Sequence, residues 1–377
     1  MTRKPMGARP AVAIALRADL RASMIADAEL ARLREFADVR IAEFGGAVHT
    51  YERPEPDAEA EAGLAAFAAG ADALVVTHGA PRVTAEVLAA CPDLRFVGEL
   101  EGDRFAGRID VDAAAARGVV VVDTTHGSSW PVAEYALAMA ILGLRDSGRY
   151  VRALAEGEPV ANAARGDAAR LGNRELTGRR VGLVGFGHIA WRLVEFLRPF
   201  RVTLVAHDPY APREIGDALG VSFGSLDAVM STSDVVICLA PLTPSSRGSI
   251  TERHLRSLRP GSVFVNVSRG AVVDAVGLEA VAARGEVVFC LDVLDPEPVP
   301  VGHPLRALPN VLLTPHLAGT TDDAGQRFFA LMVDELHRFA AGLEPQAQLT
   351  PRVMAGRHDD GAHARLTTTL SAEGSSR

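Results

Sequence analysis

Residues 179–190 read Arg-Arg-Val-Gly-Leu-Val-Gly-Phe-Gly-His-Ile-Ala. The apolar run at the start of this stretch predicts a buried strand, and Trp191–Leu197 predicts a helix. The Gly-x-Gly-x-x-Ala turn between them has a physical reading: Gly185 permits a tight turn, and Gly187 lets the backbone approach a pyrophosphate. Ala190 is small enough for helix and strand to pack closely. The N-terminus of the helix would then face the phosphates.

A second predicted strand, at residues 202–206, ends in His207-Asp208. An acid at this distance from the glycine turn is placed to accept hydrogen bonds from an adenosine ribose. Glycine patterns alone are weak evidence, and a turn that binds nothing is the alternative. The turn and the acid together predict a nicotinamide dinucleotide site.

Composition narrows the class of protein. The net charge of -8 and the isoelectric point near 5.8 argue against a general nucleic-acid binder. Lys4 is the only lysine, which disfavours Schiff-base chemistry. The three cysteines form no CxxC pair, fit a reducing compartment, and are expected to be core residues rather than metal ligands. No apolar run reaches membrane-spanning length. We expect a soluble cytoplasmic protein without a metal site.

Strand-like and helix-like segments alternate along the chain, which predicts an α/β fold with parallel sheets. The length suggests two domains. Strands are expected at residues 12–16, 73–76, 94–97, 119–122, 235–238, 262–267, 287–291 and 310–313. Helices are expected at residues 27–36, 84–90, 111–116, 131–144, 253–258, 275–284 and 322–339. Residues 53–61 are interpreted as a solvated acidic loop, and residues 157–178 as a linker.

Three further stretches follow predicted strands of the nucleotide domain, where open parallel sheets bind their ligands. They contribute Arg269, Glu297 and His316. A guanidinium can grip the oxygens of a carboxylate and a carbonyl with its planar donor fork. An imidazole can give a carbonyl a proton as hydride arrives, and a carboxylate touching it would orient it. Each residue alone has an ordinary structural reading; the ordered combination is more specific.

At this point the sequence resembles the D-isomer-specific 2-hydroxyacid dehydrogenases, over roughly residues 73–343. The Asn-Val-Ser-Arg-Gly, Asp-Val-x-x-x-Glu-Pro and Thr-Pro-His-x-x-Gly elements stand where that family has them. The resemblance implies that Arg269 binds the substrate carboxylate, His316 is the acid/base, and Glu297 is its partner. The cofactor residues that it implies are Gly185, Gly187, His188, Ile189, Asp208, Ala240, Pro241, Ser268, Arg269, Asp292, His316 and Gly319.

Within that set, the resemblance implies that Asp292 binds the nicotinamide carboxamide and that the backbone of His188 and Ile189 binds the pyrophosphate. Asp208 favours NAD over NADP because its charge would repel a 2'-phosphate, although Arg213 is close enough to weaken that preference. The resemblance also implies two Rossmann-like domains, with an NAD-binding domain (129–319) inserted into an outer substrate domain (10–128 plus 320–350). It implies a homodimer. Residues 351–377 are expected to be a disordered tail.

The outer domain departs from the family pattern. The family has a short glycine-rich loop there, whose amides receive the substrate carboxylate, whereas this chain carries Glu99, Glu101 and Asp103 in a longer loop. Such acids would repel an anionic substrate unless they face away or pair with Arg104 and Arg108, and a phosphorylated substrate is disfavoured. A polar or partly cationic substrate is conceivable. The candidate substrate residues are His78, Glu99, Leu100, Glu101 and Gly102.

Two other functions stay open at this point. An NAD(H)-sensing binding protein on the same fold could retain all three polar residues and differ only in lacking turnover. A formate or phosphite dehydrogenase is the other alternative. Formate-type members have glutamine in place of Glu297, which counts against a formate dehydrogenase. The motifs do not exclude a phosphite dehydrogenase.

Overall fold

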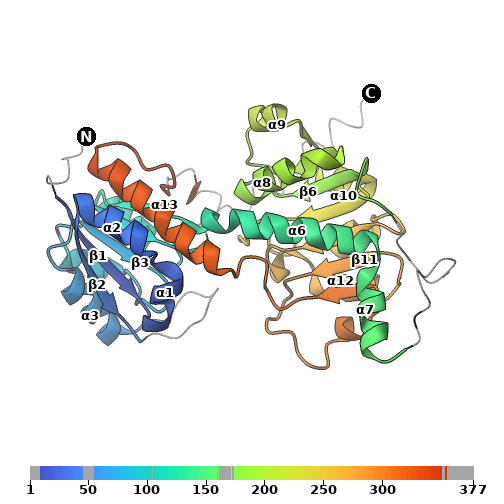
Figure 1. Cartoon of the computed structure of the whole chain (residues 1–377), viewed down its shortest axis with the longest axis horizontal. Coiled ribbons are helices and arrows are strands. Elements are labelled where there is room, and N and C mark those ends of the chain that lie inside the picture. Colours follow the sequence, from blue (N-terminus) through green and yellow to red (C-terminus); the bar gives the residue numbers. More distant parts are fainter. Residues whose placement is uncertain are drawn as a thin grey trace. The chain divides into compact units, whose positions relative to one another are not determined.

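The computed structural model describes residues 9–45, 55–103, 105–158, 160, 171, 174–349 and 353–354. These residues form two compact units (Figure 1). The first contains the described residues up to Ser128 and those from Thr321 onward, and the second spans Ser129–Thr320. Each unit is built on a sheet whose strands all pair in parallel, so the predicted α/β fold is confirmed. Apart from residues 353–354, the predicted tail lies outside the described residues, and so do residues 159, 161–170, 172 and 173 of the predicted linker.

The strands of the first unit are β1 (Ala11–Leu16), β2 (Asp38–Glu43), β3 (Ala73–Val76), β4 (Phe96–Glu99) and β5 (Val120–Asp123). Its helices are η1 (Ala18–Leu20), α1 (Arg21–Met24), α2 (Asp27–Phe36), α3 (Ala58–Ala68), α4 (Ala85–Ala90), α5 (Val111–Ala116), η2 (Thr125–Ser128) and α13 (Asp322–Ala340). In the described part of this unit the sheet order is β2-β1-β3-β4-β5.

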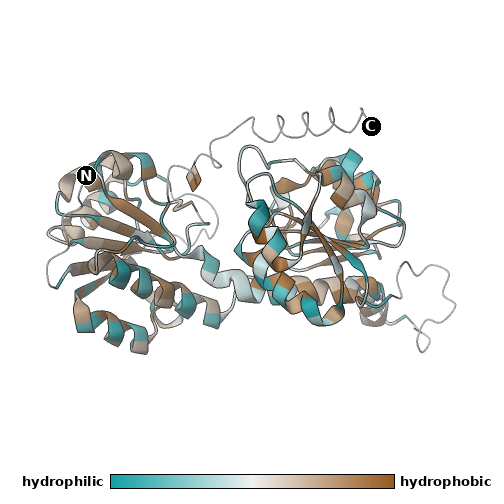
Figure 2. Cartoon of the chain, turned by 90° about the horizontal axis from the view of Figure 1, so that it is seen from above, coloured by the Kyte–Doolittle hydropathy of each residue, from teal (hydrophilic) through white to brown (hydrophobic). Residues whose placement is uncertain are grey.

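This unit has one hydrophobic core on each face of its sheet, and alternating side chains of β1 point into the two cores. Val12, Ile14 and Leu16 pack with residues of α2 and α13, and Ala13 and Ala15 pack with residues of α3, α4 and α5. Figure 1 shows α2 and α13 over one face of the sheet. Figure 2 shows apolar strands inside and polar helix surfaces outside. Burial on both faces explains why the strands read as continuous apolar runs.

The strands of the second unit are β6 (Arg180–Val184), β7 (Thr203–His207), β8 (Ser222–Phe223), β9 (Val235–Cys238), β10 (Val263–Asn266), β11 (Val288–Leu291) and β12 (Val311–Leu313). Its helices are α6 (Ser129–Leu144), α7 (Ser147–Ala155), α8 (His188–Leu197), η4 (Arg198–Phe200), α9 (Arg213–Leu219), α10 (Leu226–Thr232), α11 (Glu252–Arg256), η5 (Gly270–Val272), α12 (Ala275–Ala282) and η6 (Pro304–Ala307).

The order of this second sheet, as far as the chain is described, is β12-β11-β10-β9-β6-β7-β8. The chain therefore runs from β6 outward to β8 and then returns to the other side of β6 with β9. Ligands of open α/β sheets bind outside the carboxyl ends of the strands at such a switch point. Residues of α6 and α8 pack on one face of the sheet, and residues of α10, α11 and α12 pack on the other.

The sequence prediction was wrong at several places in the first unit. It omitted β2, and it made a loop of residues 53–61, of which Ala58 to Glu61 form the first turn of α3. The side chain of Asp57 accepts a hydrogen bond from N of Ala60, which caps this helix and favours its start among acidic residues. Strand β4 also begins two residues later than expected, because N of Leu94 is bonded to O of Cys91 in a turn.

Three further observations bear on the class of protein. No helix in the described part of the chain is long and apolar enough to cross a membrane. The three cysteines are unpaired and buried. Among the residues that the structure describes, no group of three or more His, Cys, Asp or Glu side chains is arranged to hold a metal ion.

Candidate active site

The glycine turn joins β6 to α8. Gly185 has φ of +93°, and a Cβ there would lie 2.7 Å from N of Ala240, so both conformation and space require glycine. Gly187 is the N-cap of α8 and has no side chain to cap the first turn. The N-terminus of α8 therefore lies at the glycine turn, and the absence of a Cβ at Gly185 lets the turn pack directly on the loop after β9. These features fit a bound pyrophosphate.

Asp208, just after β7, supports this turn. Its Oδ2 accepts a hydrogen bond from N of Phe186 at 2.7 Å, and its Oδ1 accepts from N of Tyr210 at 2.8 Å and N of Ala211 at 2.9 Å. Each carboxylate oxygen can accept more than one bond, so capacity remains for ribose hydroxyls. The sequence argument predicted only the ribose contact and missed the role in shaping the turn.

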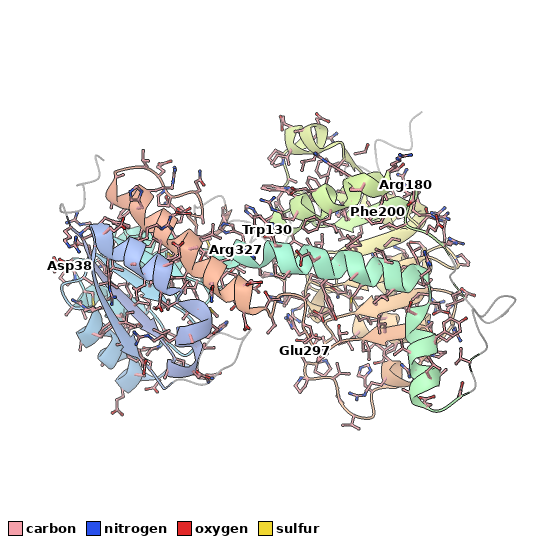
Figure 3. All side chains as sticks on the ribbon, viewed as in Figure 1. Asp38, Trp130, Arg180, Phe200, Glu297 and Arg327 are labelled. Atoms are coloured by element: carbon pink, nitrogen blue, oxygen red, sulfur yellow. The ribbon has the colours of Figure 1, made fainter. Side chains whose placement is uncertain are left out.

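Glu297 and His316 form a hydrogen-bonded pair. Oε2 of Glu297 lies 2.9 Å from Nδ1 of His316, and Oε1 of Glu297 accepts from N of Leu294 at 3.0 Å. Burial alone would raise the pKa of Glu297, but the hydrogen bond and charge of His316 outweigh it, so the pKa of this carboxyl is lowered. Figure 3 labels Glu297 in the loop that follows β11. The pair thus engages the Nδ1 side of the His316 ring.

The backbone of His316 is in the left-handed region, with φ of +56°. Non-glycine residues there are strained and persist where their surroundings hold them. Asp292 provides that support: its backbone O accepts from N of His316 at 2.9 Å, and its carboxylate accepts from Oγ1 of Thr314, N of Leu317 and N of Ala318 at 2.6, 2.8 and 2.9 Å. Asp292 is 1% exposed. Its carboxylate is thus largely committed to the loop that carries His316.

Arg269 follows β10, in a segment shaped by Asn266. Oδ1 of Asn266 accepts from N and Oγ of Ser268 at 3.1 and 2.9 Å, and its Nδ2 donates to O of Arg269 at 3.2 Å. A Cβ on Gly270 would collide with the backbone of Leu294, so this segment lies against the loop after β11. The charge of Arg269 also contributes to lowering the pKa of Glu297. The structure therefore brings together the three predicted polar residues.

The remaining predicted cofactor residues follow other strands of the same sheet. The loop after β9 places N of Ala240 beside Gly185, and O of Pro241 accepts from Oγ of Ser246 at 2.6 Å. Sγ of Cys238 lies 3.2 Å from Oγ of Ser268, which ties this strand end to the next one. Ile189, in the first turn of α8, is half-buried and packs against the core of the second unit. Gly319 lies in the loop after β12, beyond His316.

The predicted substrate residues of the first unit form a charge network. Arg108 donates from Nη1 to Oε1 of Glu99 at 2.6 Å and from its backbone N to Oε2 at 3.0 Å. Its Nη2 lies 2.6 Å from Nδ1 of His78, and Nε2 of His78 lies 3.0 Å from Oε2 of Glu101. Because a guanidinium only donates, the hydrogen of a neutral His78 ring is on Nε2 and points to Glu101. Glu99 is thus compensated by Arg108.

Burial decides which side chains of this loop reach outward. Glu99 and Leu100 are fully buried, whereas the Glu101 side chain is about a quarter exposed. Burial raises the pKa of Glu99, against the attraction of Arg108. Burial, followed by the charge of Glu99, raises the pKa of Asp123 to about 7. The sequence argument missed Asp123, although an acid at the end of a predicted strand was the available signal.

Comparison with known proteins places these features in a family. Residues 137–318 match the model of the D-isomer specific 2-hydroxyacid dehydrogenase, NAD binding domain. The chain is 33% identical over 269 residues to a mitochondrial formate dehydrogenase of Hordeum vulgare, covering 70% of this chain and 68% of that one. It is 28% identical over 270 residues to a D-3-phosphoglycerate dehydrogenase of Archaeoglobus fulgidus, covering 71% of this chain.

The match spans about half the length of such phosphoglycerate dehydrogenases, 50% for the Archaeoglobus protein. Among solved structures, a phosphoglycerate oxidoreductase from Rhizobium etli superposes with a TM-score of 0.72 at 26% identity, covering 91% of this chain and 99% of that one. The likeness therefore extends over both units of the fold.

Proposed function

Because the chain belongs to the D-isomer-specific 2-hydroxyacid dehydrogenases, we propose that it interconverts a D-2-hydroxy acid and the corresponding 2-oxo acid. The cofactor is NAD, which when bound supplies or accepts the hydride. The similarity to phosphoglycerate dehydrogenases does not assign their substrate to this chain, because the matching region covers only half of the length of those proteins.

The observation that carries this proposal is the His316–Glu297 pair, 2.9 Å apart, with Arg269 close enough to influence Glu297. His316 acts as the acid/base: in reduction its Nε2 gives a proton to the carbonyl oxygen of the substrate, and in oxidation it takes one from the hydroxyl. Glu297 orients the ring through Nδ1 and stabilises its charged form. Arg269 binds the substrate carboxylate with its planar fork.

We propose the following cofactor contacts within the second unit. The amides of His188 and Ile189 receive the pyrophosphate above Gly185 and Gly187. The free acceptor capacity of Asp208 receives the ribose hydroxyls, so that NAD is preferred over NADP. The segments at Ala240, Pro241, Ser268 and Gly319 line the nucleotide. Asp292 both supports the His316 loop and offers its one remaining acceptor position to the carboxamide.

For the first unit we propose that the backbone of the loop at Glu99 and Leu100 and the exposed part of Glu101 meet the substrate, and that the buried Gly102 sets the turn between them and the rest of the loop. His78 acts on it through Glu101, which it holds at 3.0 Å. Since Arg108 is already paired with Glu99, Glu101 leaves this loop negatively charged. A phosphorylated substrate is therefore disfavoured, and a neutral or hydroxylated side chain is preferred.

Two attributes of the whole protein are also proposed from the family. We expect a homodimer, which size-exclusion chromatography with light scattering would test. We also expect a cytoplasmic location, in keeping with three unpaired cysteines.

The direct test of the proposed function is NADH oxidation, followed by absorbance, with a panel of 2-oxo acids. The panel contains glyoxylate, hydroxypyruvate, pyruvate, aromatic and sugar-derived acids, and a phosphorylated acid, with NADPH as the cofactor control. We expect turnover of at least one unphosphorylated acid, with kcat/KM for the phosphorylated acid at least about tenfold lower. Tight NADH binding with no turnover anywhere would contradict the proposal and indicate an NAD(H)-sensing protein.

A further inference from the structure

The loop after β4 folds over two buried carboxylates at the carboxyl edge of the first sheet. Glu99 ends β4 and Asp123 ends β5, and the register of these parallel strands pairs the two residues directly. A Cβ placed on Gly102 would lie 2.6 Å from Oδ2 of Asp123 and 2.7 Å from Cδ of Glu99. The loop backbone therefore lies in contact with both acids, and glycine is required at this point.

Asp123 and Thr125 fasten this loop at two places. Oδ2 of Asp123 accepts a hydrogen bond from N of Ala106 at 2.8 Å. Oδ1 of Asp123 accepts from N and Oγ1 of Thr125 at 2.8 and 2.6 Å. The same Thr125 hydroxyl accepts from N of Gly102 at 2.9 Å, so it links Gly102 to Asp123. We call Gly102, Ala106, Asp123 and Thr125 the clamp.

The conformation of the loop explains why fastening is needed. Asp103 and Ala106 have φ of 55° and 47°, in the left-handed region that is unfavourable for residues with a Cβ. Such backbone persists where surrounding interactions over-determine it. Glu99 adds a third point by accepting from N of Arg108 at 3.0 Å. Amides of this loop thus point inward to acids and a hydroxyl, which set its shape.

We propose that Asp123 and Thr125 are positioning residues for the substrate, because the clamp holds the loop in the one conformation in which Glu101 meets it. This inference rests on the proposed function, which assigns the loop to the substrate. Neither residue touches the reacting atoms; both act through the amides of Gly102 and Ala106. Loss of the clamp therefore weakens substrate binding while the nucleotide site in Ser129–Thr320 keeps its affinity.

The test compares Thr125→Val, which keeps the shape but removes the hydroxyl, with Thr125→Ser, which keeps the hydroxyl. Asp57→Ala, which removes the N-cap of α3 in the same unit, controls for a general loss of stability. We measure kcat and KM for the best 2-oxo acid, the Kd of NADH, and residue-resolved hydrogen exchange of the amides of Gly102 and Ala106.

Thr125→Val is expected to raise KM about tenfold, with kcat within about threefold and the Kd of NADH within about twofold of the wild type. Exchange at Gly102 is expected to accelerate about tenfold in this variant. Thr125→Ser is expected to rescue both quantities, and Asp57→Ala to leave both near the wild type.

Two results would overturn the proposal. One is that Thr125→Val leaves both KM and the exchange rate at Gly102 unchanged. The other is that kcat falls, KM rises and NADH binds more weakly in Thr125→Val, and that Asp57→Ala shows the same changes. Failure of the proposed function is distinguishable: the wild type then reduces no 2-oxo acid. If exchange at Gly102 still accelerates in Thr125→Val, the clamp stands without its role toward the substrate; if it does not, the clamp is also refuted.

Discussion

At the scale of single residues, His316 combines a left-handed backbone with a carboxylate partner. Its φ of +56° is maintained by bonds that converge on Asp292, and its ring is oriented by Glu297. Strain that is held by surrounding groups is frequent where a side chain must stay in one position. The structure thus explains why two acids, Asp292 and Glu297, serve one imidazole: one fixes its backbone and the other its ring.

Replacement of Glu297 by glutamine tests the second of these roles. Glu297→Gln keeps a hydrogen-bond acceptor for Nδ1 of His316 but removes the charge that the lowered pKa of Glu297 maintains. We expect kcat for reduction to fall at least about tenfold, because the charged form of the ring loses its carboxylate partner. The measurement is kcat for reduction of the best 2-oxo acid by Glu297→Gln and by the wild type. A rate within about twofold of the wild type would contradict a role for the charge of Glu297.

Asp208 illustrates what the residue pattern could and could not reveal. The spacing from the glycine turn predicted an acid directed at a ribose. The three amides that its carboxylate receives, including N of Phe186, are backbone contacts that no side-chain pattern encodes. Any substitution at Asp208 is therefore expected to perturb the turn as well as the proposed cofactor preference.

At the scale of elements, the segments that sequence predicted best were those with one dominant signal. The apolar runs of β3 and β9 and the helix α2 have the bounds that were expected, because burial on both faces or a regular apolar spacing sets them. The edge strand β2 was missed, since its residues are mostly half-exposed and carry charges. Helix α3 was missed because two prolines and several acids at residues 53–61 indicate a loop more strongly than Asp57 indicates a helix cap.

The same contrast holds for the candidate site. Arg269, Glu297 and His316 could be named from motifs, and the structure brings them together because their strands are neighbours in one parallel sheet. Asp123 was not named: its place at the end of a predicted strand was a signal, but its role depends on the register of β4 with β5 and on a loop that returns to it. The pairing of a loop acid with Arg108 was one of the possibilities that the sequence left open, and the fold-back of the loop selects Glu99 as its partner.

At the scale of the whole molecule, the second unit is one continuous stretch, whereas the first contains described residues from before Ser129 and after Thr320. The buried ionisable groups of the first unit therefore contribute to the free energy of unfolding of the chain. The folded chain keeps a proton on Asp123 up to about pH 7, whereas the unfolded chain releases it near 3.8. Between these values the unfolded state binds fewer protons, so the free energy of unfolding falls as pH rises. Glu297 has the opposite sign, at and below its ordinary value of 4.5.

Asp123→Asn removes this pH dependence. The lost hydrogen bonds lower the free energy of unfolding of the variant by an amount that hardly changes with pH. In the wild type, the titration of Asp123 lowers the free energy of unfolding from pH 4 to 7, by up to about 4 kcal/mol for a shift of about three pH units. The variant is therefore expected to become more stable relative to the wild type as pH rises. Urea unfolding of both proteins at pH 5 and pH 8 measures this. Parallel changes in the two proteins would show that Asp123 does not titrate in this window.

The central claim is that His316 transfers the proton that accompanies hydride transfer. The most direct measurement is single-turnover reduction of the best 2-oxo acid by wild type and His316→Asn, with NADH affinity determined in parallel. Asparagine suits this position because it tolerates the left-handed backbone that His316 adopts. The account predicts a rate reduced by about 10² to 10⁴-fold with the Kd of NADH within about threefold. A rate near that of the wild type, or a loss fully explained by weaker NADH binding, would contradict it.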